Sequence, residues 1–79
     1  GQAIQLTPRE FALLEYFLYN AGNTLSKAQL LEHVWGAGFA GDMNVVEVYV
    51  GYLRKKLESV PGRAHIRTVR GQGYRLVEE

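Results

Sequence analysis

The chain has 79 residues, of which 47% are hydrophobic and 22% charged, with no cysteine and a formal net charge of +1. This length holds one small domain, and the composition excludes a disulfide framework, a thiol nucleophile and a cysteine-based zinc site. Since the sequence has neither an apolar run of membrane-spanning length nor a secretory signal pattern, we expect a cytoplasmic protein.

Charge is distributed unevenly along the chain. Residues 1–43 carry a net charge of −2, from Arg9 and Lys27 against Glu10, Glu15, Glu32 and Asp42. Residues 44–77 carry +5, from Arg54, Lys55, Lys56, Arg63, Arg67, Arg70 and Arg75 against Glu47 and Glu58. A basic half is typical of a protein that binds a polyanion, although a solvated charged surface gives the same pattern.

The first expected elements are a short strand over residues 3–6 and a helix that begins after Thr7. Thr7 and Glu10 have the spacing of a capping box, and Pro8 suits the first helical position. Gly22 can adopt the positive φ that often follows a helix end. The apolar residues of this helix predict a single buried stripe, made of Phe11, Leu14, Phe17 and Leu18.

A second helix follows a brief strand at residues 24–25. Ser26 and Gln29 repeat the capping-box spacing, and Gly36 marks the expected end. The inner face should consist of Leu30, Leu31, Val34 and Trp35. Residues 36–41 include three glycines and predict a flexible loop, in which Phe39 either covers the core or forms an exposed contact point.

The third helix is expected over residues 44–58, although the β-branched run at 45–50 could also form a strand. Helical periodicity over the longer window favours a helix, because four apolar residues continue one face for three turns: Val46, Val50, Leu53 and Leu57. Asp42 or Asn44 can cap its start, and residues 59–62 should break its end. Residues 66–69 and 74–77 then predict a hairpin around the glycine-containing connection 70–73.

The outer side of the third helix is the first candidate surface for function. With the apolar face turned inward, Asn44 and Val48 point outward and Val45 lies on one flank. A valine can contact a thymine methyl group in the major groove of DNA, where an asparagine can reach a base edge. Gly51, on the same side, costs about 1 kcal/mol relative to alanine and suggests close approach of a partner. The alternative is that both valines pack under the glycine-rich loop.

Other side chains suit phosphate oxygens, which position a protein on DNA without reading its sequence. Tyr52, Lys55 and Lys56 lie further along the third helix, and the indole N–H of Trp35 could donate at the rim of the core. Arg54 lies nearer the core edge and could instead have a structural ion-pair partner.

Arg70 is the sharpest single candidate. Gly71 and Gly73 permit a tight bend, and an arginine projecting from a thin hairpin can enter a narrow A·T-rich minor groove, where the potential is most negative. The alternative is that Gly71 and Gly73 serve only the backbone of the turn, and that Arg70 has no role in binding.

Catalysis has little support in this sequence. His33 and His65 are isolated from acidic residues at metal-ligand spacing, and Ser26 and Ser59 are explained by a cap and a turn. We therefore expect no enzymatic activity, no metal and no cofactor.

Four sequence blocks lie in order along the chain: LTPREFALL at 6–14, LLEHVWG at 30–36, YLRKKL at 52–57 and IRTVRGQGYRL at 66–76. Together they resemble the winged-helix effector domain of OmpR/PhoB-type two-component response regulators, over residues 6–77. The resemblance implies an α+β winged helix-turn-helix with three helices and a C-terminal β-hairpin wing. It also implies transcription regulation through double-stranded DNA.

The resemblance further implies roles for individual residues. The third helix would lie in the major groove and the wing in the adjacent minor groove. Base contacts would come from Asn44, Val45, Val48 and Arg70. Backbone contacts would come from Trp35, Tyr49, Tyr52, Lys55, Lys56 and Thr68. Two copies would sit head-to-tail on direct-repeat half-sites, and Phe39 on its loop would be a candidate for contact with RNA polymerase.

The sequence departs from the family pattern at two points. Of the family's N-terminal four-stranded platform only the final strand, around residues 3–6, is present, and the receiver domain is absent. We therefore expect residues 1–79 to be a single-domain fragment. In addition, Gly51 and Tyr52 stand where many members carry basic residues, which predicts weaker phosphate binding and reliance on paired copies. The alternative function is a winged-helix protein-interaction module whose valine face docks another protein.

Overall fold

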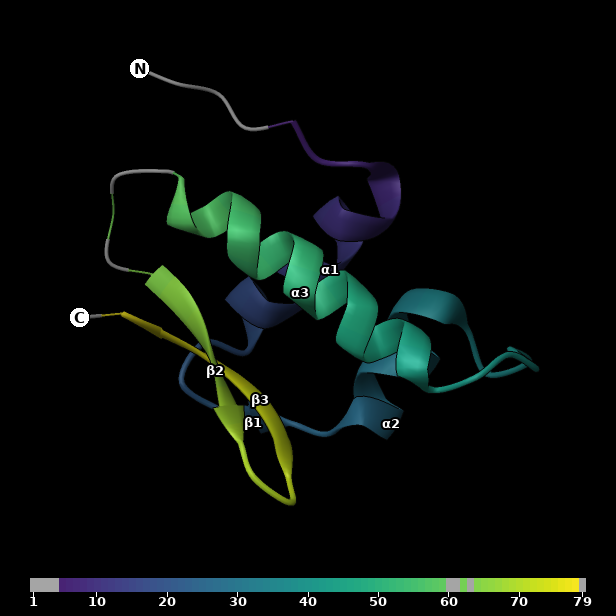
Figure 1. Ribbon diagram of the computed structural model, residues 1–79. Coiled ribbons are helices and arrows are strands. Elements are labelled where there is room, and N and C mark those ends of the chain that lie inside the picture. Colours follow the sequence, from purple (N-terminus) through teal and green to yellow (C-terminus); the bar gives the residue numbers. More distant parts are fainter. Residues whose placement is uncertain (1–4, 60–61, 63, 79) are drawn as a thin grey trace.

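The computed structural model describes residues 5–59, 62 and 64–78. Within them the helices and strands follow in the order α1 (Pro8–Tyr19), β1 (Thr24–Leu25), α2 (Lys27–Leu30) with its π-helical continuation η1 (Leu31–Trp35), α3 (Asn44–Glu58), β2 (Ala64–Val69) and β3 (Gly73–Glu78) (Figure 1). This order confirms the predicted α+β fold with a C-terminal hairpin. No helix in these ranges is long and apolar enough to cross a membrane.

Both predicted capping boxes form. The Thr7 hydroxyl accepts from the Glu10 amide while the Glu10 carboxylate accepts from the Thr7 amide, and Ser26 and Gln29 repeat the exchange at α2. These bonds satisfy amides that no helical carbonyl can reach, so they fix where each helix begins. The second helix ends at Gly36, as predicted, with a positive φ of 106°.

The predicted apolar stripe of α1 is partly wrong. The buried residues of α1 are Glu10, Leu13 and Phe17, whereas Phe11 and Leu18 are both 57% exposed. Leu14 is half-buried against the core. The carboxylate of Glu10 is tolerated inside because the Lys56 ammonium from α3 binds it, which makes this face available for burial.

A short strand was also predicted at residues 3–6, and the structure tests only its second half. Residues 3 and 4 lie outside the described ranges, and Gln5 and Leu6 belong to no strand.

The inner face of α3 is confirmed. Val46, Val50 and Leu53 are buried and Leu57 packs at the edge of the core. At the start of this helix, the Asp42 carboxylate accepts from the Asn44 amide at 2.9 Å, so Asp42 and not Asn44 satisfies the first turn. The helix ends at Glu58, and of the predicted breaker, residues 60 and 61 lie outside the described part.

The three strands form one antiparallel sheet in the order β1-β3-β2. In β3, Tyr74 pairs with Leu25 of β1 and with Thr68 of β2, which fixes the register of the hairpin. Gly73 is required where β3 meets β1, because a Cβ there would lie 2.0 Å from the Leu25 carbonyl oxygen. The short strand β1 therefore ties the turn end of the hairpin to the start of α2.

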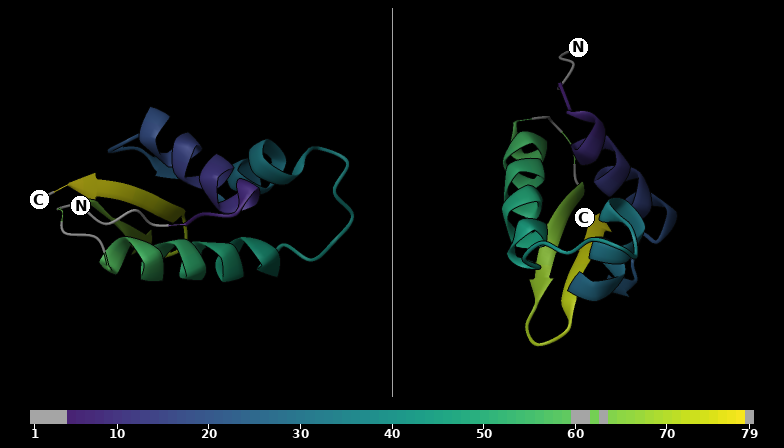
Figure 2. Two further views of the ribbon diagram at one scale, coloured as in Figure 1. Left: turned by 90° about the horizontal axis from the view of Figure 1, so that it is seen from above. Right: turned by 90° about the vertical axis from the view of Figure 1, so that its right-hand side faces the viewer.

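The hairpin is placed beside α3 by this sheet. Figure 2 shows α3 next to β2 and α1 next to β3, with the turn of the hairpin reaching past the helices. This turn is the wing, defined here as residues 69–73. The third helix and the wing are thus neighbouring projections of one small core.

Candidate nucleic-acid interface

The outer side of α3 carries a continuous exposed stripe. Asn44, Glu47, Val48 and Gly51 stand at positions i, i+3, i+4 and i+7, and all four are exposed. Val48 keeps 40% of its surface exposed, so it does not pack under the glycine-rich loop. Val45, in contrast to Val48, is half-buried and packs against the core at the flank of the helix.

Gly51 lies in the stripe with open space in front of it. No protein atom comes within 4 Å of the position that a Cβ would take, and its φ is not in the positive region. Neither packing nor backbone conformation therefore accounts for a glycine here. A glycine leaves room for a close partner surface at this point of the helix.

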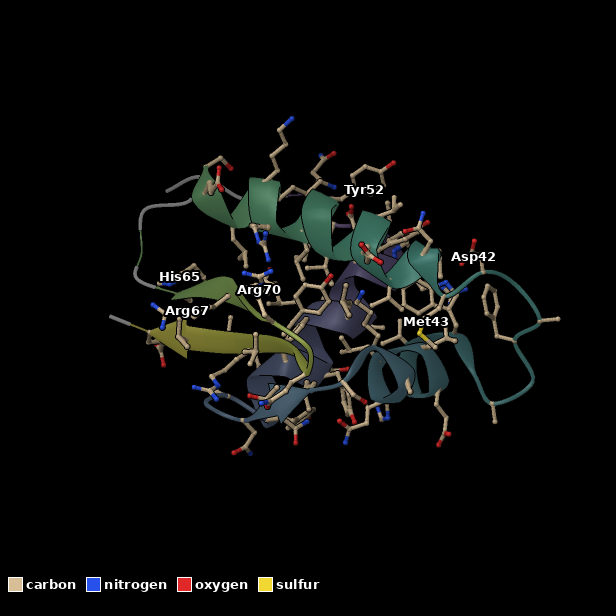
Figure 3. All side chains as sticks on the ribbon, turned by 60° about the horizontal axis from the view of Figure 1, so that its bottom comes forward. Asp42, Met43, Tyr52, His65, Arg67 and Arg70 are labelled. Carbon is tan, nitrogen blue, oxygen red and sulfur yellow. The ribbon has the colours of Figure 1, made fainter. Side chains whose placement is uncertain are left out.

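An aromatic ridge borders the stripe, formed by Trp35, Phe39, Tyr49 and Tyr52. Tyr49 contacts the Trp35 ring edge-on at 5.4 Å between centroids and the Tyr52 ring at 5.6 Å. Trp35 and Tyr49 are half-buried against the core, whereas Tyr52 is 52% exposed at the outer edge of α3 (Figure 3). Of the two tyrosines in the ridge, Tyr52 therefore offers the more accessible hydroxyl for a phosphate.

Two further contacts hold the Trp35 end of the ridge. The Arg9 guanidinium lies over the Trp35 ring, 5.2 Å from its centroid, and donates to the Val34 carbonyl. Phe39 tilts against Trp35 at 6.5 Å and remains 37% exposed, so it neither enters the core nor stands free in its loop.

The two neighbouring lysines of α3 have different surroundings. Lys55 is exposed, but the Lys56 ammonium binds the buried Glu10 carboxylate and donates to the Gln5 carbonyl at 2.9 Å. The Lys56 bond holds the pKa of Glu10 below its ordinary value, against the opposing effect of burial. The structure thus gives Lys56 a structural role, and its predicted phosphate contact stays a prediction.

Arg54 links the third helix to the wing strand. Its Nη2 donates to the Thr68 hydroxyl at 3.0 Å, and its Nε is buried without a hydrogen-bond partner among the described residues. Among the described residues, the structural partner of Arg54 is therefore a hydroxyl group and not the carboxylate that an ion pair would need. Because the Thr68 oxygen accepts here, its own proton is directed elsewhere, and Thr68 is exposed.

Arg70 extends from the wing turn. It is exposed, and the turn behind it is closed by a 3.0 Å bond from the Gln72 amide to the Val69 carbonyl, with Gly71 at a φ of 76°. Figure 3 shows Arg70 on the side of the hairpin nearer α3, while His65 and Arg67 lie toward the other end of β2. The wing therefore presents a cation beside the outer stripe of α3.

An ion pair at the start of α3 was not expected from the sequence. Lys27 of α2 binds Glu47 Oε2 at 3.0 Å, and this bond raises the pKa of Lys27. Both residues line a depression of about 500 Å³ that the wing closes on its other side. Helical spacing from Asn44 and Val48 could have identified Glu47 as outward-facing, but its partner lies 20 residues away.

Comparison with known proteins identifies the family to which this fold and surface belong. The family described as "Transcriptional regulatory protein, C terminal" matches residues 1–76. The chain belongs to this family. Its members are the OmpR/PhoB-type DNA-binding domains, so the resemblance suggested by the four sequence blocks is confirmed. The chain is a regulatory domain of the response-regulator type and not an enzyme.

Individual relatives are similar to the chain in sequence, and solved structures are similar to it in fold. The transcriptional regulatory protein PrrA of Mycobacterium leprae is 51% identical over 76 residues, which cover 96% of this chain and 33% of PrrA. The DNA-binding domain of Bacillus subtilis CssR superimposes with a TM-score of 0.85 at 36% identity, covering 96% of this chain and 82% of that one. The RstA DNA-binding domain of Klebsiella pneumoniae, solved in complex with the RstA box, gives 0.80 at 31% identity, covering 98% and 77%. The chain thus spans about a third of the length of PrrA.

Proposed function

We propose that the domain binds double-stranded DNA sequence-specifically, with α3 in the major groove and the wing in the adjacent minor groove. In this arrangement Asn44, Val45 and Val48 face bases from α3, and Arg70 enters the minor groove. The backbone contacts are Trp35, Tyr49, Tyr52, Lys55 and Thr68.

One observation carries this proposal. The exposed stripe of α3 and the exposed Arg70 lie on neighbouring elements that Arg54 and Thr68 join directly. A helix fits the major groove, and an arginine is favoured in a narrow minor groove. The RstA domain, whose structure was solved with DNA, has the same fold, which supports a DNA role for this surface.

The proposal extends from the domain to the regulator of which it would form a part. We infer that the domain serves as the cytoplasmic effector of a two-component regulator, with two copies arranged head-to-tail on direct-repeat half-sites. Phe39, exposed beside Trp35 in the loop before α3, is the proposed contact for RNA polymerase.

Selection of bound duplexes from a random pool tests the function. We expect a recurring motif, with repeat spacing that reports the arrangement of the two copies. The affinity for the selected site should fall with salt, with a slope of log K against log salt of about −3 to −6 per monomer, from several phosphate contacts. Recovery of no motif, together with an affinity that salt does not change, would favour the protein-interaction module instead.

A further inference from the structure

Glu47 is the acidic member of the exposed stripe on α3. It stands between Asn44, one turn before it, and Gly51, one turn after it, next to Val48. The predicted contacts on this face are neutral or basic, and a carboxylate beside a phosphate backbone is repelled. An acidic side chain in this place therefore calls for a specific explanation.

The Glu47 side chain is held from the neighbouring helix. Lys27, the first residue of α2, donates to its Oε2 at 3.0 Å, with the two side chains 40% and 50% exposed. An ion pair this exposed adds little to stability, but it restricts the rotamers of the glutamate. Since an ionised carboxylate has about four acceptor positions, Oε1 can still accept from another donor.

The ion pair lies where α3 faces the wing. Lys27 and Glu47 line the same depression as Thr68, Arg70 and Tyr74. A duplex that contacts both α3 and the wing would pass directly over this depression. Glu47 would then be aimed at the bases, and the Lys27 ammonium would offset the repulsion between the carboxylate and the phosphates.

We propose that Glu47 is a specificity-determining residue that accepts a hydrogen bond from the exocyclic amine of a cytosine, and that Lys27 is the positioning residue that orients it. The proposal rests on the proposed function. In the major groove cytosine offers a donor, guanine offers two acceptors and thymine offers an acceptor with a methyl group. Adenine combines a donor with an acceptor that would repel the carboxylate, so cytosine suits a lone carboxylate best.

The experiment is base selection from a random duplex pool, repeated with Glu47→Gln, Lys27→Met, Lys27→Arg and the Lys27→Met/Glu47→Gln double variant. Glu58→Gln is the matched control, because it removes the same charge from the far end of the same helix. Thermal unfolding of each variant checks that the fold is retained. The preference for each base at each position is then compared with that of the wild-type chain.

We expect the wild-type chain to prefer cytosine at one position by roughly tenfold, the size of a single base contact. Glu47→Gln should weaken this preference severalfold, because a neutral amide oxygen accepts less strongly than a carboxylate and its NH2 group can donate to other bases, and Glu58→Gln should keep it. Lys27→Met should weaken it severalfold, Lys27→Arg should restore it, and in the double variant the loss of Lys27 should change nothing further, because no carboxylate remains to be oriented.

Two negative results have different meanings. A wild-type chain that selects a motif, together with a Glu47→Gln variant that selects the same bases as strongly, overturns the inference and leaves the proposed function intact. A wild-type chain that selects no motif at all overturns both.

Discussion

The guanidinium of Arg54 on α3 donates to the hydroxyl of Thr68 on β2 at 3.0 Å, which joins the third helix to the strand that carries the wing. The spacing between major and minor grooves is fixed by the duplex, so a protein that enters both needs its two elements held at a set separation. We take this bond to be one of the contacts that set it.

Substitution of Thr68 tests the link between α3 and the wing. Thr68→Val keeps the branched shape suited to a strand but removes the acceptor, and should cost about 0.5–1.5 kcal/mol of unfolding free energy in urea. The affinity for a selected duplex should fall about fivefold, the equivalent of one hydrogen bond. Thr68→Ser, which keeps the hydroxyl, is the control. Equal stability and affinity in the valine and serine variants would show that the bond has no such role.

The pair of Glu10 and Lys56 should make stability depend on pH. The Lys56 ammonium lowers the pKa of Glu10 below its ordinary value of about 4.5 in the folded state. The contribution of the pair is therefore fully present above that value and is lost as the pH falls through the lower, folded pKa. In urea unfolding between pH 7 and pH 3, the wild-type chain should lose more free energy than Glu10→Gln, whose amide keeps the cap but carries no charge. Parallel pH profiles would contradict this.

The neighbouring lysines Lys55 and Lys56 should separate DNA binding from stability. Lys55→Met should reduce the salt slope of DNA binding by about 1, because one phosphate contact is lost, with little change in stability. Lys56→Met should leave the slope unchanged and destabilise the fold by about 1–3 kcal/mol, because it leaves a buried carboxylate without its cation. The two variants remove the same charge from adjacent positions, so each controls for the other. A lower slope in Lys56→Met would restore that lysine as a phosphate contact.

Gly51 offers a test of close approach on α3. Gly51→Ala should raise the unfolding free energy by up to about 1 kcal/mol, because alanine favours the helix and the added methyl group meets open space. If DNA lies against this face, the same variant should bind the selected duplex more weakly despite its higher stability. Unchanged or tighter binding would argue that no partner surface comes close to Gly51.

Gly73 is the contrasting glycine. Its φ is 149° and an added Cβ would collide with the Leu25 carbonyl oxygen, so Gly73→Ala should destabilise the domain by more than about 2 kcal/mol in urea unfolding. The loss of stability is expected because β3 passes close to β1 at Gly73. A Gly73→Ala variant as stable as the wild-type chain would show that the two strands are not in such close contact.

Arg70 on the wing should act on binding without acting on the fold. Arg70→Ala should weaken binding by about 1–3 kcal/mol, mainly at sites with A·T-rich flanks, where an arginine in a narrow minor groove is most favoured. Its unfolding midpoint should stay at the wild-type value because the side chain is exposed. Equal affinities of the variant and wild type for A·T-rich and G·C-rich flanks would remove the wing from the mechanism.

Local sequence signals predicted most of the fold. Both helix starts followed from capping boxes, and the helical period of Val46, Val50 and Leu53 outweighed the β-branched composition of the segment. The buried face of α1 could not be predicted in this way. The apolar residues of α1 lie along two overlapping faces of the helix, and either face could be buried. The face that is buried includes Glu10, and its burial depends on Lys56, 46 residues further along the chain.

The candidate site was predictable to the same extent. Outward-facing residues such as Asn44, Val48 and Arg70 follow from periodicity and turn chemistry, and they are exposed as expected. Pairings between distant residues do not follow from local pattern. For this reason three contacts could not be predicted: the bond of Lys56 to Glu10, the bond of Arg54 to Thr68 and the ion pair of Lys27 with Glu47.

We propose above all that α3 and the wing contact one duplex together. Titration of the isotope-labelled chain with its selected duplex, followed by backbone amide NMR, tests it most directly. We expect the largest shifts at Asn44, Val48 and Gly51 on α3 together with Arg70 and Gly71 in the wing, at the same DNA concentration, and small shifts at Phe11 and Leu18 on α1. Shifts confined to one of the two elements, or centred on α1, would contradict the account.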